Sequence, residues 1–394
     1  MIDATTGDSW KSDGRVLVYC EGWGTGGIES LMMSVLGSAA FKQSGLSFDI
    51  YDVCDWNTGY DWEIARLGGR RIVSYPGEVP GLWKKFSTGI SDFRRLLQSG
   101  RYSVVHVNAT NGLNLIYAYI AKKEKVPVRV VQSHNSYFDK AERHGTTKAL
   151  GHALGRLFFS RSATASIAVS HAAGEFVFGR RPFRVVPNGI NVRRYAFDET
   201  ARDDTRRALG VSSDTFLIGS LGKIEPRKNP LFQVEIFARV HKRIPNSKLL
   251  LVGNGSLEAR VLGRLRELNL DKDYLHVPAT SNAERYYSAL DTFLMPSTSE
   301  GFGLVALEAQ CSGLPVYVSE AAPSEIDATP FVSRLRLSEG SDAWAGAILD
   351  GAARRREASR ADAWGLLEGT AYDAEIDART IVETWADESG HGER

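Results

Sequence analysis

The sequence predicts an α/β protein of two doubly wound domains, each a parallel sheet covered by helices. Short runs rich in Val, Ile and Leu alternate with helical patterns along nearly the whole chain, which is typical of such sheets. The alternation is interrupted at the turn-forming residues Pro187, Asn188 and Gly189 and then resumes. The length of 394 residues also exceeds that of most single hydrophobic cores, so two domains are expected.

The first domain is expected to span residues 1–190 and to be joined by a C-terminal helix within 365–385. Its helices include Ile28 to Leu36 and Leu113 to Lys123, since these stretches are apolar with helical periodicity. Its strands are expected at 15–19, 48–53, 71–75, 103–108, 128–133, 166–170 and 183–187.

The second domain is expected to span residues 191–364. Its strands are the apolar runs at 216–222, 248–253, 274–278, 292–296 and 315–319. Ligands of doubly wound sheets bind where the carboxyl ends of the strands face a crevice. We therefore expect the functional residues in the loops that follow these strands.

Composition excludes several classes of protein. Forty-eight basic and forty-seven acidic residues leave a net charge of +1, which argues against a nucleic-acid partner. Cys20, Cys54 and Cys311 lie far apart without metal-ligand spacing and are expected to be buried, reduced thiols. The polar start MIDATTGDSWKSDG has no apolar signal region, and no apolar run approaches about 20 residues. We expect a cytoplasmic protein or one on the inner face of the cell membrane.

A glycine-rich stretch, CEGWGTGGIES, follows the first strand and opens the first helix. Its Gly22, Gly24 and Gly27 match the G-x-G-x-x-G spacing of dinucleotide-binding enzymes. Asp49 or Asp52 could be the ribose-binding acid of such an enzyme, and Asp49 lies at about the expected spacing, twenty-two positions past Gly27. An NAD(P)-dependent oxidoreductase is therefore one hypothesis, but it leaves the motifs of the second domain unexplained.

A loop with two carboxylates lies in MPSTSEGFGLVALEAQCSGLPVYVS, between a strand and a helix. Its glycines let backbone approach a ligand closely, and the helix start attracts phosphate. Glu300 and Glu308 would be repelled by phosphate alone, so they need hydroxyl donors on both sides of it. A nucleoside diphosphate sugar has that layout, with a ribose diol, a diphosphate and a hexose. The alternative is a helix-capping carboxylate and a solvated glutamate.

A basic cluster occurs in GSLGKIEPRKNP, directly after a strand of the second domain. Lys223, Arg227 and Lys228 lie at the sheet edge from which the glutamate loop also emerges. Cations in this place would neutralise a diphosphate and stabilise it as a leaving group. The alternative is a solvated basic turn.

The joint order of these motifs resembles the family 4 retaining glycosyltransferases of the GT-B fold, of the bacterial cell-surface polysaccharide or glycolipid type. The first half agrees through GGIE, VVHVN, QSHNS, AVSHAAGEF and VVPNGIN, and the resemblance covers most of residues 15–380. It implies two Rossmann-like domains facing each other across a cleft. The first domain would then be the acceptor side and the second would bind the nucleotide-sugar donor.

The resemblance also implies roles for single residues. Glu308 should accept hydrogen bonds from the ribose, and Glu300 should hold hydroxyls of the hexose. Lys223 and Lys228 should grip the diphosphate. The expected catalytic residues are His134, Lys223, Lys228 and Glu300. The expected donor-binding residues are Gly26, Gly27, Arg227, Gly301, Phe302, Gly303, Leu304 and Glu308.

Three positions depart from the family pattern. Lys223 stands where Arg is usual, and Asn108 stands where a second His is frequent. Residues 276–282 lack the glycine that commonly follows the strand at 274–278 in the family, so the family's mode of base recognition does not carry over directly. None of these departures concerns the two glutamates.

The expected reaction is transfer of a hexose from a nucleotide-diphosphate sugar, UDP-sugar favoured over GDP-sugar, to an acceptor hydroxyl with retention. Exopolysaccharide, capsule or glycolipid synthesis is the expected setting, with a sugar or lipid-linked acceptor. No D-x-D stands at the expected strand end, so neither a metal nor a cofactor is expected. A non-catalytic nucleotide-sugar-binding scaffold remains an alternative.

The stretch at 148–158 predicts an amphipathic helix. Its apolar stripe consists of Leu150, Leu154, Leu157 and Phe158. Its partly basic face carries Lys148, His152 and Arg156, which recur every four residues. Such a helix could contact anionic lipid or a polyprenyl-diphosphate acceptor as a peripheral membrane contact. The interpretation that we prefer is an ordinary domain helix with its stripe in the core.

Overall fold

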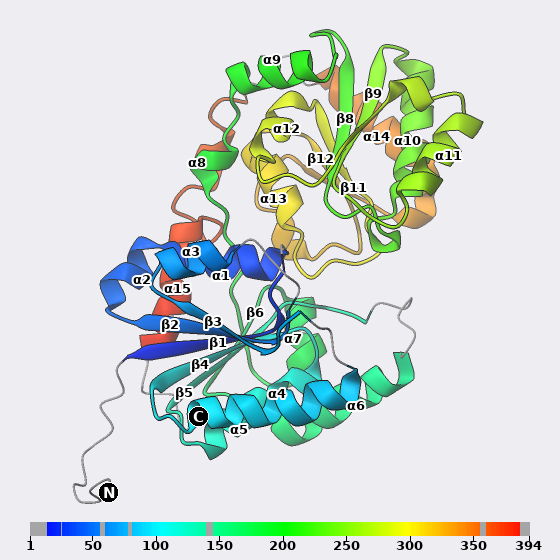
Figure 1. The fold of residues 1–394 in the computed structure, drawn as a ribbon. Helices are drawn as coiled ribbons and strands as arrows, with labels where there is room; N and C mark the ends of the chain where they lie inside the picture. Colours follow the sequence, from blue (N-terminus) through cyan, green and yellow to red (C-terminus); the bar gives the residue numbers. More distant parts are fainter. Residues whose placement is uncertain are drawn as a thin grey trace, which may run out of the picture. The chain divides into compact units, whose positions relative to one another are not determined.

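The computed structural model describes residues 14–24, 26–55, 60–77, 81–138, 145–354 and 360–386. The chain forms two compact units (Figure 1). Unit 1 comprises residues 1–186 together with 375–394, and unit 2 comprises residues 187–374.

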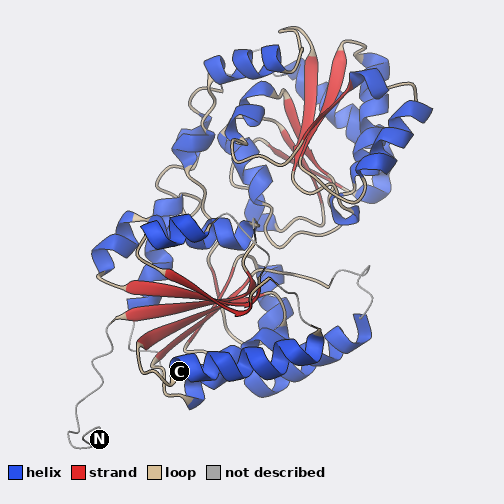
Figure 2. Ribbon diagram, in the orientation of Figure 1, coloured by secondary structure: helices blue, strands red, loops and turns tan. Residues whose placement is uncertain are grey.

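Unit 1 is built on a seven-stranded sheet in the order β3-β2-β1-β4-β5-β6-β7, with every neighbouring pair parallel. Runs of β-branched residues form these strands because both faces of the sheet are covered by helices (Figure 2). The strands are β1 (Arg15–Gly22), β2 (Ser47–Cys54), β3 (Arg70–Tyr75), β4 (Tyr102–Ala109), β5 (Val128–Ser133), β6 (Ala165–Ala168) and β7 (Arg184–Val185).

Helices connect the strands of unit 1, and the last one comes from the other end of the chain. They are α1 (Gly27–Gly37), α2 (Ala39–Ser44), α3 (Asp61–Arg66), α4 (Leu82–Leu97), η1 (Gly112–Asn114), α5 (Leu115–Lys123), α6 (Gly145–Phe159), α7 (His171–Phe178) and α15 (Ala374–Ala386). In α15 the buried Trp385 packs against Phe41 and donates its indole N–H to His106 Nδ1 at 3.0 Å. The core of unit 1 is therefore completed by a helix that follows unit 2 in the chain.

Unit 2 is built on a six-stranded parallel sheet in the order β10-β9-β8-β11-β12-β13. Its strands are β8 (Phe216–Leu221), β9 (Ser247–Val252), β10 (Tyr274–Val277), β11 (Thr292–Met295), β12 (Val316–Ser319) and β13 (Val332–Leu335). Its helices are α8 (Val192–Tyr195), α9 (Glu199–Ala208), η2 (Pro226–Lys228), α10 (Pro230–Arg243), α11 (Glu258–Glu267), η3 (Asp271–Asp273), α12 (Glu284–Ala289), α13 (Leu304–Cys311), η4 (Ser324–Ile326), η5 (Leu337–Glu339), α14 (Gly340–Arg354) and η7 (Ala363–Leu366).

The predicted class of two doubly wound α/β domains is confirmed by these two sheets. Every strand expected from the sequence has a counterpart, although β7 is shorter than expected. The strand β13 was not expected. Cys20, Cys54 and Cys311 are buried, as expected.

The preferred interpretation of residues 148–158 is wrong, because the apolar stripe of α6 lies on the surface. Leu157 and Phe158 are 70% and 66% exposed, and Leu150 and Leu154 are also exposed. The opposite face packs against η1. There a Cβ added to Gly155 would lie 2.1 Å from the carbonyl oxygen of Gly112. A side chain at position 155 would block this close approach, so Gly155 faces η1 and the large apolar residues lie on the exposed side of α6.

On that packed face, one polar side chain fixes the helix. His152 is buried, and its Nδ1 accepts the backbone N–H of Gly112 at 2.9 Å. Burial lowers the pKa of His152 to about 4, with Arg156 acting in the same direction. The imidazole is therefore neutral near pH 7 and can accept this hydrogen bond.

Candidate active site

The glutamate loop of unit 2 connects β11 to α13. Gly303 precedes α13 with φ +105°, a backbone conformation that side chains with a Cβ rarely adopt. This geometry lets the helix begin abruptly at Leu304, and Phe302 is buried beside it. The loop thus leads directly into a helix N-terminus, which attracts anions.

Glu300 is the centre of an ion-pair cluster in this loop. Its carboxylate lies 2.6 Å from Lys228 Nζ and 2.9 Å from Arg227 Nη1, and the residue is only 4% exposed. Burial by itself would raise the pKa of Glu300, but Lys228 and Arg227 outweigh burial and lower it below the usual value. The structure therefore brings three of the sequence-predicted residues together, with the carboxylate ionised.

Sheet topology explains this meeting. β8 pairs directly with β11, so the loops after the two strands emerge side by side. The backbone N–H of Thr298 donates to the carbonyl of Arg227 at 2.8 Å, which joins the two loops. Lys223 follows β8, is exposed, and lines one small cavity together with Lys228. The basic cluster is thus a structured edge of the sheet, and only Lys223 fits the alternative of a solvated turn.

Glu308 lies in α13 and is surrounded by hydroxyl groups. The Tyr287 hydroxyl donates to Glu308 Oε2 at 2.5 Å, and Tyr195 hydrogen-bonds the same carboxylate. Burial raises the pKa of Glu308, while the two tyrosines and Arg194 counteract it. The alternative of a solvated glutamate does not fit these contacts.

Tyr195 and Tyr287 are site residues that the sequence did not predict. Tyr195 belongs to α8, and Tyr287 belongs to α12, some ninety residues later. Neither lies in a glycine-rich loop or at a strand end, where the ligands of doubly wound sheets are expected to bind. Their meeting at Glu308 is a tertiary contact, and no local pattern in the sequence signals it.

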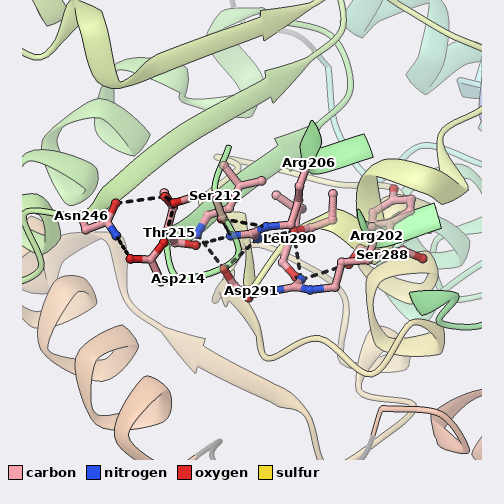
Figure 3. Close-up of polar contacts among 12 residues, drawn as sticks. Arg202, Arg206, Ser212, Asp214, Thr215, Asn246, Ser288, Leu290 and Asp291 are labelled. Atoms are coloured by element: carbon pink, nitrogen blue, oxygen red, sulfur yellow. Dashed lines mark hydrogen bonds and ion pairs between the residues drawn. The ribbon is translucent and has the colours of Figure 1, made fainter. Parts of the chain in front are cut away.

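The C-terminal end of α12, next to Tyr287, is held by three arginines. Arg202 donates to the carbonyls of Ser288, Ala289 and Leu290, and Arg206 donates to that of Ala289 (Figure 3). Arg360 donates to the carbonyls of Tyr287, Ser288 and Leu290. These carbonyls lack helical partners, and guanidinium groups complement the negative end of the helix. The helix that carries Tyr287 is therefore fixed at its end.

In unit 1, the glycine-rich stretch is organised by Glu29. The Glu29 carboxylate accepts the backbone N–H groups of Gly24 at 2.7 Å and Gly26 at 3.0 Å. A Cβ added to Gly26 would lie 2.8 Å from Glu29 Oε2, so the carboxylate occupies the space of a side chain there. α1 begins at Gly27. Gly26 and Gly27 thus form a compact helix start within the loop.

The acids that a dinucleotide-binding enzyme would need are not accessible. Asp49 is fully buried, where it pairs with Arg15 at 3.0 Å and Arg70 at 2.8 Å. Asp52 is also fully buried and lies 2.6 Å from Arg71. Neither carboxylate reaches a surface where a ribose could bind. The hypothesis of an oxidoreductase is therefore left with the glycine spacing alone.

His134 follows β5 and is nearly buried. Its Nε2 lies 2.8 Å from Asn108 Oδ1, while the Asn108 amide nitrogen donates to the carbonyl of Tyr19 at 3.2 Å. This network assigns the His134 proton to Nε2. Burial, with His106 nearby, lowers the pKa of His134 to about 3, so the ring is neutral near pH 7. Asn108, a departure from the family pattern, is thus the partner of His134.

Within the described ranges, no group of three or more His, Cys, Asp or Glu side chains has a geometry that could hold a metal ion. Among the helices of the same residues, none combines the length and the apolar character needed to cross a membrane.

The fold is that of the GT-B glycosyltransferases. The crystal structure of HepE from Anabaena in complex with UDP and glucose superposes with a TM-score of 0.75, at 16% sequence identity. The match covers 94% of this chain and 99% of HepE. At 16% sequence identity, this superposition shows that the two proteins share a fold.

Sequence comparison gives the family. Residues 38–194 match the model described as Glycosyltransferase Family 4, and residues 201–327 match the one described as Glycosyl transferases group 1. A Bacillus subtilis (strain 168) protein named "Putative glycosyltransferase EpsF" is 30% identical over 383 residues, which is 95% of this chain and 97% of EpsF. The chain therefore belongs to glycosyltransferase family 4, and its activity is that of a glycosyltransferase.

A further relative has a more specific name. It is the UDP-Gal:alpha-D-GlcNAc-diphosphoundecaprenol alpha-1,3-galactosyltransferase of Escherichia coli. That protein is 26% identical over 233 residues, covering 57% of this chain and 59% of its own length.

Proposed function

We propose that the protein transfers a hexose from a UDP-sugar to an acceptor hydroxyl with retention of configuration. The observation that carries the proposal is the Glu300 cluster, in which a buried carboxylate and two cations lie at a helix N-terminus. Such a cluster offers acceptors for sugar hydroxyls and donors for phosphate oxygens within one loop.

In unit 2, each part of the donor would have its own group. Glu308 accepts the ribose hydroxyls, and Glu300 accepts hydroxyls of the hexose. Lys223 and Lys228 bind the diphosphate as positive charges, and Arg227, which pairs with Glu300 here, is a further phosphate donor. The backbone N–H groups of residues 301–304 add the helix N-terminus to the same phosphate.

In unit 1, we assign two further roles. His134 is a neutral imidazole that contacts the transferred hexose near its anomeric carbon, and Asn108 holds it in one tautomer. Gly26 and Gly27 bring backbone close to the diphosphate, because neither carries a side chain. Glu29 keeps that backbone in place.

The chemical step exchanges one bond at the anomeric carbon. The bond between this carbon and the diphosphate oxygen breaks, and the diphosphate leaves as an anion stabilised by Lys223, Lys228 and the start of α13. The acceptor oxygen then bonds to the same face of the carbon, and its proton passes to the departing phosphate oxygen. This front-face route needs neither a covalent carboxylate nucleophile nor a metal ion, and we propose it on that basis.

The donor and the setting are proposed from the relatives. The Escherichia coli relative is named for a UDP-sugar and a diphosphoundecaprenol acceptor, and the HepE structure contains UDP. Both favour UDP over GDP. We therefore propose a sugar or lipid-linked acceptor and a role in exopolysaccharide, capsule or glycolipid synthesis.

A lipid-linked acceptor would bring the protein to a membrane surface, and α6 offers a contact. Leu157 and Phe158 are exposed near the C-terminal end of α6. This end packs against α5, because the ring centroids of Phe159 and Tyr119 lie 5.1 Å apart. There Lys122, Lys123 and Arg161 are exposed as well. Apolar insertion beside cations is the pattern of peripheral binding to anionic lipid.

The experiment that tests the function is a panel of nucleotide sugars, assayed for slow hydrolysis without acceptor. Release of UDP from one UDP-sugar is the expected result. Release from GDP-sugars alone would contradict the proposed donor. Binding of a donor without hydrolysis, and without transfer to any acceptor, would instead favour the non-catalytic scaffold.

A further inference from the structure

Two tyrosines from separate elements meet at one carboxylate in unit 2. Tyr287 in α12 and Tyr195 in α8 both hydrogen-bond Glu308, and their rings meet edge to face with centroids 5.9 Å apart. Tyr287 is fully buried and Tyr195 is partly buried. Each tyrosine thus supports the position of the other as well as that of the carboxylate.

Both elements are held firmly, so the hydroxyls have little freedom. The three arginines described above, of which Figure 3 shows Arg202 and Arg206, fix the end of α12 beside Tyr287. At its other end, Glu284 pairs with Arg194 of α8 at 3.0 Å, which ties the two tyrosine-bearing helices together. The thiol of Cys311 in α13 donates to the carbonyl of Val192 at 3.2 Å and links α8 to the helix of Glu308.

We propose that Tyr195 and Tyr287 are positioning residues of the nucleotide site, which orient the Glu308 carboxylate so that its remaining lone pairs accept both ribose hydroxyls. This inference rests on the proposed role of Glu308. A carboxylate offers about four acceptor sites on its two oxygens. The tyrosines use two of them, and the two hydroxyls of a ribose match the other two.

The same hydroxyls influence the charge of the carboxylate. Burial raises the pKa of Glu308, the two tyrosines and Arg194 lower it, and Glu284 raises it; the Cys311 thiol also faces this carboxylate. Removing one tyrosine hydroxyl therefore raises the pKa of Glu308 further. Because a protonated carboxyl accepts fewer hydrogen bonds, nucleotide affinity should fall as the pH falls through this pKa.

Calorimetric titration of UDP into wild type, Tyr195→Phe and Tyr287→Phe between pH 5 and pH 8 tests the inference. We expect each variant to bind UDP about 10-fold more weakly at pH 8. We also expect the loss of affinity at acidic pH to begin at a higher pH than in wild type. Tyr286→Phe, which changes the neighbouring tyrosine of α12, should match wild type in both respects.

A nucleotide without ribose hydroxyls separates positioning from packing. Wild type should bind 2′,3′-dideoxy-UDP more weakly than UDP, and the two tyrosine variants should bind it as wild type does. Unchanged UDP affinity and pH profile in both variants, or an equal loss with the dideoxy nucleotide, would overturn the inference. Should Tyr287→Phe fail to fold, Tyr195→Phe decides. If wild type binds no nucleoside diphosphate, the proposed function itself fails, whereas binding by wild type with unchanged variants overturns this inference alone.

Discussion

At the scale of single residues, the charged groups of unit 2 neutralise one another inside the candidate site. Glu300 has two cationic partners, and each of them is also a proposed phosphate ligand. A partly buried ion pair contributes little net stability, because desolvation offsets much of the attraction. Without a donor, Glu300, Arg227 and Lys228 neutralise one another. In the proposed complex the two cations would bind the diphosphate, and Glu300 would bind hydroxyls of the hexose.

Glu300→Ala should abolish sugar transfer while UDP binding stays measurable. The substitution removes the acceptor for hexose hydroxyls and leaves Lys223 and Lys228 to bind the diphosphate. Transfer assays and calorimetric titration with UDP check the two halves of this expectation. Glu267→Ala, on the surface of α11, is the matched control. Wild-type transfer rates in Glu300→Ala would remove the role assigned to this residue.

Three buried histidines of unit 1 should make the protein less stable in acid. Burial lowers the pKa of His106 and of His152 to about 4 and that of His134 to about 3. The pKa of a histidine in the unfolded chain is about 6.5. Below that pH the unfolded chain binds protons that the folded chain does not, so the free energy of unfolding decreases as the pH is lowered. Each histidine contributes a slope of about 1.4 kcal/mol per pH unit between roughly pH 6.5 and pH 4.

Unfolding experiments at several pH values check this slope. His106→Gln should flatten the dependence of stability on pH, whatever it does to stability at pH 7. His171→Gln, at an exposed position, should leave the slope unchanged. Equal slopes for wild type and His106→Gln would contradict the assignment of a neutral buried imidazole.

At the scale of elements, α6 shows that amphipathic periodicity does not say which face packs. The face of Gly155 and His152 lies against η1, and the leucine face lies on the surface. The orientation of α6 is decided by the close approach of its backbone at Gly155 to that of Gly112. Burial of large apolar side chains usually decides which face of a helix packs, but in α6 these side chains are exposed.

Gly155→Ala should destabilise the protein by about 1–3 kcal/mol, because its Cβ would overlap the carbonyl of Gly112. Gly263→Ala in α11 is the matched control, since a Cβ at Gly263 would meet nothing within 4 Å. The control should gain about 0.4–1 kcal/mol through its lower unfolded entropy. Denaturant unfolding measures both changes, and an equal response of the two variants would contradict the packing described for α6.

The exposed face of α6 gives a second prediction at this scale. Replacing Leu157 and Phe158 together by Glu should lower binding to vesicles that contain phosphatidylglycerol, because it removes apolar insertion and adds negative charge. Co-sedimentation with anionic and with neutral vesicles measures this. Trp62→Glu, at another exposed aromatic residue, is the control and should bind as wild type does. Undiminished binding of the double variant would rule out α6 as the contact.

At the scale of the whole molecule, unit 1 depends on a helix that lies beyond unit 2 in the chain. Trp385→Ala should cost about 3–5 kcal/mol of stability, because it leaves a cavity where the indole packs against Phe41. UDP binding should remain detectable, since Glu300 and Glu308 lie in unit 2. Thermal unfolding and UDP titration check the two expectations. An unchanged melting temperature would contradict the role of α15 in the core.

Much of the fold was predictable because buried parallel strands are continuous apolar runs. The strand β13 was missed because Val332–Leu335 is a four-residue edge strand whose two central residues, Ser333 and Arg334, are polar. The glutamate loop and the basic cluster were predictable because each directly follows a predicted strand, where ligands of doubly wound sheets bind. Tyr195 and Tyr287 could not be found, since only tertiary packing brings them to Glu308.

The position of α15 also has a consequence for synthesis on the ribosome. Unit 1 is translated first, yet Ile381, Val382 and Trp385, which close its core, are translated only after all of unit 2. Unit 2 can therefore reach its native state while the nascent unit 1 still exposes an apolar groove. Chaperone contact during that interval, and the order in which the two units mature, are thus set by one helix of thirteen residues.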